Sequence, residues 1–259
     1  MILGLIYPDS GRIFINGTEF NNSRRYLLRN IGGIIERPDM YGYLSAYENL
    51  KIFAALSDKG IKAARLQEVL DIVGLTGREK DKVKAYSQGM KQRLGIAIAM
   101  VHQPDLLILD EPTNGLDPQG IAEMRALIQS LSKDHGKTIL ISSHLLHEVE
   151  QVATSILIIH KGRKISDGPV SQLLDPDKTL IEVSTPISDR LMAMLRETTW
   201  AQYMEPAQPG LLVFKMNPSH VPALNKWLVE KEINVYGINT KHSFESYFLS
   251  ITDDTITQN

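Results

Sequence analysis

The sequence contains no cysteine among its 259 residues. A disulfide framework and thiolate metal sites are therefore excluded, and the composition fits a reducing compartment. It also lacks any apolar run of about 18 residues, the length that an α-helix needs to cross a bilayer. The apolar start Ile2–Ile6 is too short for a signal-peptide core and has no basic flank. We therefore expect the chain to stay in the cytoplasm.

Neither sign of charge dominates the composition. There are 28 Lys and Arg against 30 Asp and Glu, a formal net charge of −2. This balance creates no field that would hold nucleic acid non-specifically, so we expect no nucleic-acid partner. The sequence is 43% hydrophobic and 22% charged, which is typical of a globular protein. Its length suffices for one large domain, or for a core domain with a small second one.

Two apolar runs with polar ends predict buried strands. They are "LLILDEP" (Leu106–Pro112) and "TILISSH" (Thr138–His144). Uninterrupted apolar runs are typical of strands covered on both faces, as in a parallel sheet under helices. Between them, apolar residues recur at helical spacing from Ile121 to Leu131, and Gly136 follows as a stop signal. This order predicts a βαβ unit and an α/β fold.

Other segments surround this unit. The capping box Ser45–Glu48 predicts a helix through Leu56, and a second helix is expected near Ala63–Val73, so the two form a helical insertion. "SILIIHKGRKISDG" predicts a hairpin that turns at Lys161-Gly162. Met1–Leu5 resembles the last turn of a helix, with Gly4 near its end.

After residue 177 the pattern restarts. Strands are expected over "TLIEVS", "LLVFKM" and "INVYGI", and helices over Ile187–Arg196, after a Ser219 cap, and over Phe244–Ile251. We expect an α/β domain over residues 1–168 and a small α+β domain over residues 178–259. The second domain shows no catalytic constellation, and its His220 and His242 are more typical of surface residues than of ligands.

Asp110 and Glu111 stand together at the carboxyl end of an apolar strand, where ligands of open α/β sheets bind. An Asp at this place can hold Mg²⁺, directly or through water, and a Glu beside it can orient or deprotonate an attacking water. A solvated loop is the alternative. His144 ends the next strand, although a single His there is more often structural than catalytic.

Ser87-Gln88-Gly89 begins a long helix in "YSQGMKQRLGIAIAM". A helix N-terminus with Ser and Gly offers free backbone N–H groups and a positive dipole end to a phosphate. The alternative is that Ser87 only caps its own helix. Asp117 lies in a turn within "NGLDPQG".

In their order, these motifs resemble the ATP-binding-cassette (ABC) ATPases over residues 1–168. "YSQGMKQR" is similar to the signature loop, "LLILDEP" to the Walker B strand, "GLDP" to the D-loop and "SSH" to the switch histidine. The resemblance implies a P-loop NTPase-type cassette that binds ATP with Mg²⁺ between two cassettes. It also implies a transmembrane permease subunit and a place on the inner face of the plasma membrane.

The resemblance assigns a role to each matching residue. Asp110 would coordinate Mg²⁺, Glu111 would be the general base, and His144 would contact the γ-phosphate. The remaining positions would serve the partner cassette: Ser87, Gln88 and Gly89 would bind its ATP, and Asp117 would couple the two sites.

Two positions depart from the usual family pattern. Gln88 adds bulk where a backbone approaches phosphate closely. Glu36, in "IGGIIERP", stands where the family usually has a Gln that touches Mg²⁺ and the transmembrane partner. Glu36 and the Met-Lys variant of the signature loop (Met90-Lys91) are similar to the bacitracin- and lantibiotic-type export and immunity ATPases. Our hypothesis is that Glu36 serves coupling to the membrane partner; a solvent-facing rim residue is the alternative.

The 259 residues contain no phosphate loop of the form Gly-x-x-x-x-Gly-Lys-[Ser/Thr]. Gly136-Lys137-Thr138 lacks the first Gly and precedes a strand. We therefore expect an N-terminally incomplete cassette with weak ATP binding in cis. It would be an incomplete copy of a transporter ATPase, a non-catalytic partner that lends Ser87–Gly89 to another cassette, or a DNA-repair or translation cassette. The first is favoured, because Asp110, Glu111 and His144 act on a nucleotide bound in cis.

Overall fold

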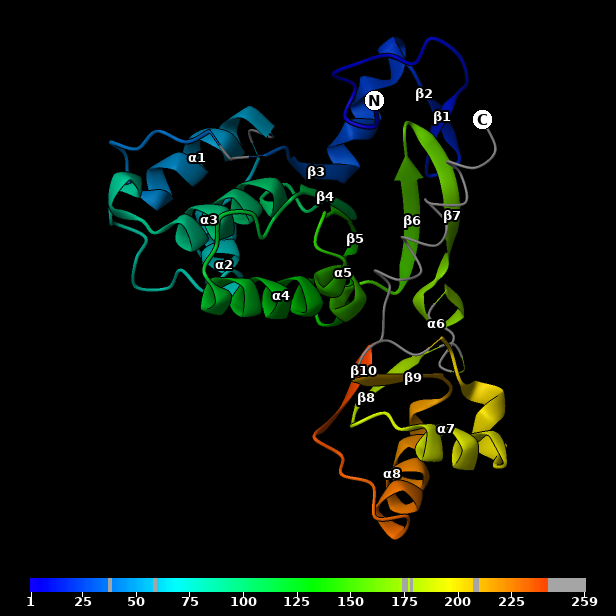
Figure 1. The fold of residues 1–259 in the computed structure, drawn as a ribbon. Coiled ribbons are helices and arrows are strands. Elements are labelled where there is room, and N and C mark those ends of the chain that lie inside the picture. Colours follow the sequence, from blue (N-terminus) through cyan, green and yellow to red (C-terminus); the bar gives the residue numbers. More distant parts are fainter. Residues whose placement is uncertain (37–38, 58–59, 174–176, 178, 207–209, 242–259) are drawn as a thin grey trace. The chain divides into compact units, whose positions relative to one another are not determined.

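The computed structural model describes residues 1–36, 39–57, 60–173, 177, 179–206 and 210–241 (Figure 1). The chain forms two compact units, Met1–Leu145 and Leu146–Asn259. The domain boundary predicted between residues 168 and 178 stays a prediction.

The first unit contains five strands and four α-helices in its described residues, with a 3-10 helical segment over Asn22–Asn30. Its strands are β1 (Ile13–Ile15), β2 (Thr18–Phe20), β3 (Ile31–Ile34), β4 (Leu106–Asp110) and β5 (Thr138–Ser142). Its helices are α1 (Ala46–Ser57), α2 (Ala63–Ile72), α3 (Gln88–Met100) and α4 (Pro118–Lys133).

A parallel sheet in the order β3-β4-β5 is the centre of this unit. In its register, Ile34 lies opposite Leu109, and Asp110 lies opposite Ser142. The predicted βαβ unit is confirmed, because β4, α4 and β5 follow one another and the two strands are parallel. Strands β1 and β2 form a separate antiparallel hairpin.

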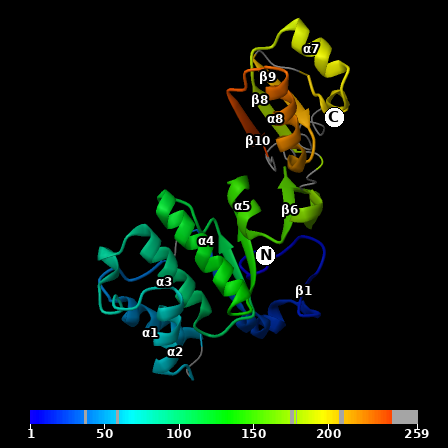
Figure 2. The same cartoon turned by 90° about the horizontal axis from the view of Figure 1, so that it is seen from below.

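Both faces of β4 contact apolar clusters, as the uninterrupted apolar run predicts. Leu107 and Leu109 are buried in the main core with residues of α1 to α4. Leu106 and Ile108 pack against a smaller cluster formed by Ile15, Phe20, Leu27 and Ile31. Helices α3 and α4, which run side by side in Figure 2, cover the face that carries Leu107 and Leu109.

Helix α3 approaches β3 very closely at Gly32. A Cβ atom built on Gly32 would overlap the carbonyl oxygen of Ala99 in α3 and would lie 2.9 Å from a methyl carbon of Leu107. Only a residue without a side chain allows this contact between a strand and a helix backbone.

The helical insertion forms as the capping box predicts. Ser45 N donates to Glu48 (2.7 Å), and Glu48 N donates to the Ser45 hydroxyl (3.2 Å), so α1 begins directly after Ser45. Asn49 is fully buried in α1 and makes three hydrogen bonds. Its side chain accepts from Tyr41 N (2.8 Å) and donates to the carbonyls of Tyr41 (3.0 Å) and Ser45 (2.9 Å). These bonds fix the loop before α1, since a buried amide requires partners.

The second unit contains a hairpin and a small α+β layer. Its elements are α5 (Leu146–Val152), β6 (Ser155–His160), β7 (Arg163–Pro169), α6 (Val170–Leu173), β8 (Leu180–Ser184), α7 (Asp189–Arg196), β9 (Leu211–Lys215), α8 (Val221–Glu230) and β10 (Gly237–Lys241). The predicted β6–β7 hairpin is confirmed, and it turns at Lys161 and Gly162, which both have positive φ.

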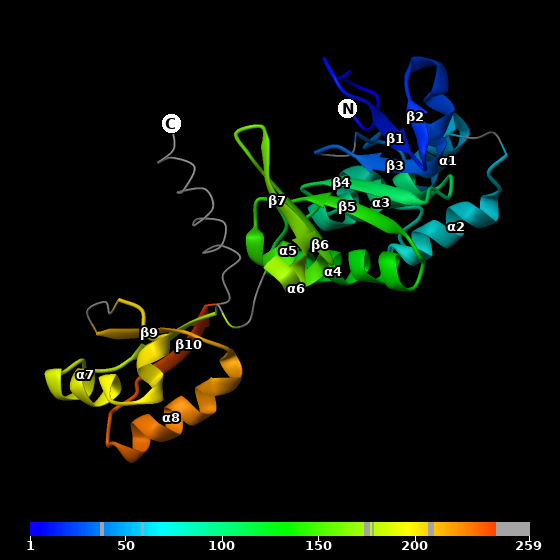
Figure 3. The same cartoon turned by 90° about the vertical axis from the view of Figure 1, so that its right-hand side faces the viewer.

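Strands β8, β9 and β10 form an antiparallel sheet in the order β10-β8-β9. Figure 3 shows α7 and α8 on one face of this sheet. Phe214, Leu191 and Leu224 are fully buried between the sheet and these helices. The strands over "TLIEVS" and "LLVFKM" and the helix near Ile187–Arg196 are thus confirmed.

Four sequence-based expectations are corrected. The apolar run Thr138–His144 predicts a strand covered on both faces, but no residue of β5 is buried and Leu140 is 45% exposed. Met1–Leu5 forms a turn closed by a bond from Gly4 N to Met1 O (2.8 Å) rather than a helix, because so short a segment does not nucleate one. Asn217, not Ser219, caps the short 3-10 turn that leads into α8, and it accepts from Ser219 N (3.0 Å). In "INVYGI" the strand begins only at Gly237. The helix expected over 244–251, and His242, lie outside the described residues.

Candidate functional site

The carboxyl ends of β4 and β5 carry the polar residues of the candidate site. Asp110 is the last residue of β4 and Glu111 follows it, whereas Ser142 ends β5 and His144 lies two residues later. Because the two strands are parallel and adjacent, their carboxyl ends meet at one edge of the sheet.

The structure brings the predicted Asp110, Glu111 and His144 together at this edge. His144 Nδ1 lies 2.8 Å from Glu111 Oε2. The Glu111 side chain is 28% exposed and that of His144 is 63% exposed, so both can be reached from solvent. Their proximity supports a joint role, although the catalytic role of each residue stays a prediction.

Ser142 links the two carboxylate residues and was missed by the sequence reasoning. Its hydroxyl lies 2.5 Å from Asp110 Oδ1 and accepts a hydrogen bond from Glu111 N (3.0 Å). The signal that could have identified Ser142 is the alignment of the two apolar runs as paired strands, which places Ser142 opposite Asp110. Register between strands that lie 32 positions apart in sequence is not readable from either run alone.

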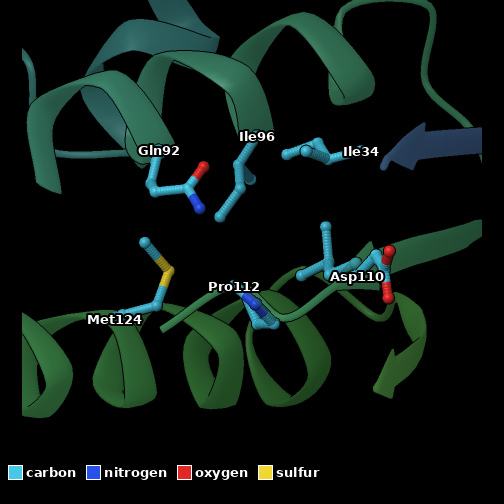
Figure 4. Close-up of a pocket in the computed structure, with 7 residues that line it drawn as sticks. Ile34, Gln92, Ile96, Asp110, Pro112 and Met124 are labelled. Carbon is cyan, nitrogen blue, oxygen red and sulfur yellow. The ribbon is translucent and has the colours of Figure 1, made fainter. Parts of the chain in front are cut away.

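Asp110 is one of the residues that line an apolar pocket, drawn in Figure 4. The pocket has no room for water and is lined by Ile34, Gln92, Ile96, Leu109, Asp110, Pro112 and Met124. Gln92 is 3% exposed, and its Oε1 has no hydrogen-bond partner among the described residues. The pocket therefore offers no space for a ligand beside Asp110.

The second group of predicted residues lies at the starts of α3 and α4. Ser87 caps α3 and accepts from Met90 N (3.2 Å), while Gln88 and Gly89 form the half-exposed first turn. Asp117 caps α4 and accepts from Gly120 N (2.9 Å). The predicted helix start at Ser87 is confirmed, whereas Asp117, which was expected in a turn, is the N-cap of α4.

The two helix starts are close neighbours. A Cβ on Gly89 would lie 3.9 Å from Leu116, the residue before Asp117. The first turn of α3 therefore lies beside the loop that precedes α4. The roles of this group toward phosphate and toward a partner stay predictions.

Tyr86 anchors the backbone directly before the Ser87 cap. Its ring is buried, and its hydroxyl donates to the carbonyl of Arg78 (2.7 Å). Burial, together with the nearby charges of Asp81 and Glu79, raises the pKa of Tyr86 to about 12. The hydroxyl therefore stays protonated and keeps donating throughout the physiological pH range.

Glu36 lies two residues beyond β3, at the sheet edge where Glu111 follows β4. It is exposed, has a φ of 54°, and makes no hydrogen bond or ion pair with the residues that the structure describes. Those residues also contain no cluster of three or more His, Cys, Asp or Glu side chains that could hold a metal ion. Among the residues that the structure describes, the Glu36 side chain thus has no partner and is exposed at the surface.

Comparison with known proteins identifies the family. The model of the ABC transporter family matches residues 1–114. The chain is 42% identical over 252 residues to the bacitracin transport ATP-binding protein BcrA of Bacillus licheniformis, covering 97% of this chain and 82% of that protein. It is 49% identical over 165 residues to the lantibiotic transport ATP-binding protein SrtF of Streptococcus pyogenes, covering 64% and 69%.

Solved structures agree with this assignment. The cbiO1 protein of Clostridium perfringens, part of the ABC transporter complex cbiONQ, matches with a TM-score of 0.60 and 25% identity over 76% of each chain. An ATP-binding subunit of an ABC transporter matches with a TM-score of 0.56 and 29% identity over 78% of each chain. The chain belongs to the ABC transporter family. Within that family it is an ABC-type ATPase that binds ATP, and the predicted α/β cassette fold is confirmed.

Across the described parts of the chain, none of the helices has the length and apolar character to traverse a bilayer.

A pair of serine substitutions separates a capping role of Ser87 from a phosphate-binding role. Ser87 and Ser188 cap α3 and α7 with the same geometry, each hydroxyl accepting from the N–H three residues on at 3.2 Å. Either change to Ala should lower the free energy of unfolding by about 1 kcal/mol, measured by urea denaturation. Only Ser87→Ala should also weaken ATP-dependent pairing of cassettes, measured by sedimentation. Equal pairing in both variants would leave Ser87 as a cap alone.

Proposed function

We propose that this chain is the ATP-hydrolysing subunit of a transporter that exports a peptide antibiotic of the bacitracin or lantibiotic type. One observation carries the proposal: Glu111 and His144 meet at 2.8 Å at the strand end that also carries Asp110. The names of the relatives in Bacillus licheniformis and Streptococcus pyogenes support the choice of substrate class.

Asp110 would hold Mg²⁺, which when bound neutralises charge on the transferred phosphoryl group. A carboxylate oxygen is a ligand that Mg²⁺ prefers, and a single carboxylate fits an ion that usually takes its other ligands from phosphate and water. The donor set at this strand end therefore fits the ion. Glu36 would stand at the rim of the same edge and couple it to the membrane partner.

Glu111 would remove a proton from the attacking water, as a positioned carboxylate can. The Nδ1–H of His144 donates to Glu111, which orients the ring and leaves Nε2 free. In the imidazolium form, Nε2–H can donate to a phosphate oxygen. His144 would in this way connect the general base with the phosphate that leaves.

The same proposal assigns the partners. Ser87, Gln88, Gly89 and Asp117 would face a second cassette, because they lie at neighbouring helix starts, where first-turn N–H groups have no carbonyl partner within the helix. A separate transmembrane permease would carry the peptide, with this subunit bound at the cytoplasmic face.

Deleting the gene in its native cells tests the function. We expect a several-fold lower inhibitory concentration of bacitracin or of a lantibiotic, and no change for an antibiotic of an unrelated class. The wild-type chain and the control Asp189→Asn, an exposed position in α7, should restore resistance, whereas Asp110→Asn should not. Unchanged susceptibility to both peptides after deletion would refute the substrate class. Full restoration by Asp110→Asn would favour a non-catalytic subunit that only lends Ser87–Gly89 to another cassette.

A further inference from the structure

We propose that Ser142 is a positioning residue for ATP hydrolysis, which orients the Asp110 carboxylate and the Glu111 backbone at once. The inference rests on the proposed function. It starts from the two hydrogen bonds of the Ser142 hydroxyl, one with Asp110 Oδ1 (2.5 Å) and one with Glu111 N (3.0 Å).

Chemistry fixes the direction of both bonds. An ionised carboxylate can only accept and a backbone N–H can only donate, whereas a hydroxyl does both. Ser142 therefore donates its single proton to Asp110 and accepts from Glu111. Alanine or valine at this position would remove both bonds, and threonine would keep them.

The bond to Glu111 supports an unfavourable backbone conformation. Glu111 has a φ of 47°, in the left-handed region that sterically disfavours residues with a Cβ. Such conformations persist where surrounding contacts hold them, and they are enriched at functional sites. The Ser142 hydroxyl holds the N–H of this residue, while the carboxylate of the same residue reaches His144.

The bond to Asp110 leaves one carboxylate oxygen free. Oδ1 is engaged by Ser142, and Oδ2 makes no hydrogen bond within the described residues. A cation or one of its water ligands can therefore use Oδ2 in a fixed orientation. Because Asp110 and Ser142 are direct partners in the β4–β5 register, the sheet itself sets the position of the hydroxyl.

Comparing Ser142→Thr with Ser142→Val separates the effect of the hydroxyl from the effect of side-chain shape. Thr and Val have the same branched shape and similar strand propensity but differ in the hydroxyl. Ser142 is exposed, so neither substitution disturbs the core. In the transporter assembly isolated through a tag on this chain, Ser142→Val should raise the Mg²⁺ concentration for half-maximal ATP turnover and lower kcat, each by about tenfold or more. Ser142→Thr should stay within about threefold of wild type.

Hydrogen exchange of the Glu111 amide provides a readout without hydrolysis. In the purified chain, Ser142→Val should speed exchange of this amide by about tenfold, and Ser142→Thr should preserve its protection. If wild-type turnover is present but Val and Thr variants match it, the proposal is wrong. If the wild-type assembly hydrolyses no ATP, the proposed function fails instead. The positioning role is then supported by faster Glu111 exchange in the Val variant and overturned by unchanged exchange.

Discussion

Replacing Glu111 with glutamine lowers ATP turnover of the isolated transporter assembly by about 100-fold or more, the range expected for loss of a general base. Glutamine keeps the size of the side chain and can still accept from His144, so the 2.8 Å contact need not break. The change removes only the basic oxygen that takes the proton. Turnover is measured as phosphate release at saturating Mg-ATP.

Glu230→Gln serves as the matched control. Glu230 is a 60% exposed glutamate of α8 that pairs weakly with Lys226 at 3.8 Å, so its loss should leave turnover unchanged. Combining Glu111→Gln with His144→Ala should produce less than the product of the two single effects, because residues in contact act as a unit. Multiplicative effects, or turnover in Glu111→Gln close to wild type, would remove Glu111 from the role of general base.

Replacing Gly32 with alanine destabilises the first unit by about 3 kcal/mol, at the upper end of overpacking effects. The added methyl group would overlap the carbonyl oxygen of Ala99, which is backbone and cannot rotate away as a side chain can. Helix α3 would have to separate from β3, which would open the core around Leu107 and Leu109. Hydrogen exchange of amides in β3 and β4 measures the change.

The chain contains its own controls for this substitution. Gly237→Ala places a methyl group in open space, also in a strand, and should cost less than about 0.5 kcal/mol. Both tryptophans, Trp200 and Trp227, contact the core of the second unit, so their fluorescence reports that unit alone. A Gly32→Ala variant with unchanged exchange in β3 and β4 would contradict the close approach of α3.

Local signals in the sequence predicted most elements correctly. The Ser45–Glu48 capping box and the Lys161-Gly162 turn depend on neighbouring residues, and both form as expected. The errors arose where a local signal was weak or where two nearby residues carried the same signal. Asn217 and Ser219 are both good capping residues two positions apart, and only the backbone geometry decides between them.

The candidate site likewise contains residues that the sequence predicted and residues that it did not. Asp110 and Glu111 were predicted because they end an apolar run at the ligand-binding edge of a parallel sheet, whereas His144 was assigned a role through the resemblance to the ABC ATPases. Ser142 was not predicted, because its importance depends on which strand lies beside it and in which register. Gln92, whose Oε1 has no hydrogen-bond partner in the described part of the chain, likewise owes its surroundings to packing between α3 and α4.

The sequence by itself determined the family motifs, the α/β order of strands and helices and the residue types that can bind Mg²⁺ and phosphate, because these are properties of short segments. Only the tertiary structure decided that Ser142 bridges Asp110 and Glu111, that Gly32 must lack a side chain, and that Asn49 holds the loop before α1. Ser142 and Gly32 depend on contacts between segments that are distant in sequence. The role of Asn49 depends on its burial, because a polar side chain that is shielded from water must find its hydrogen-bond partners within the protein.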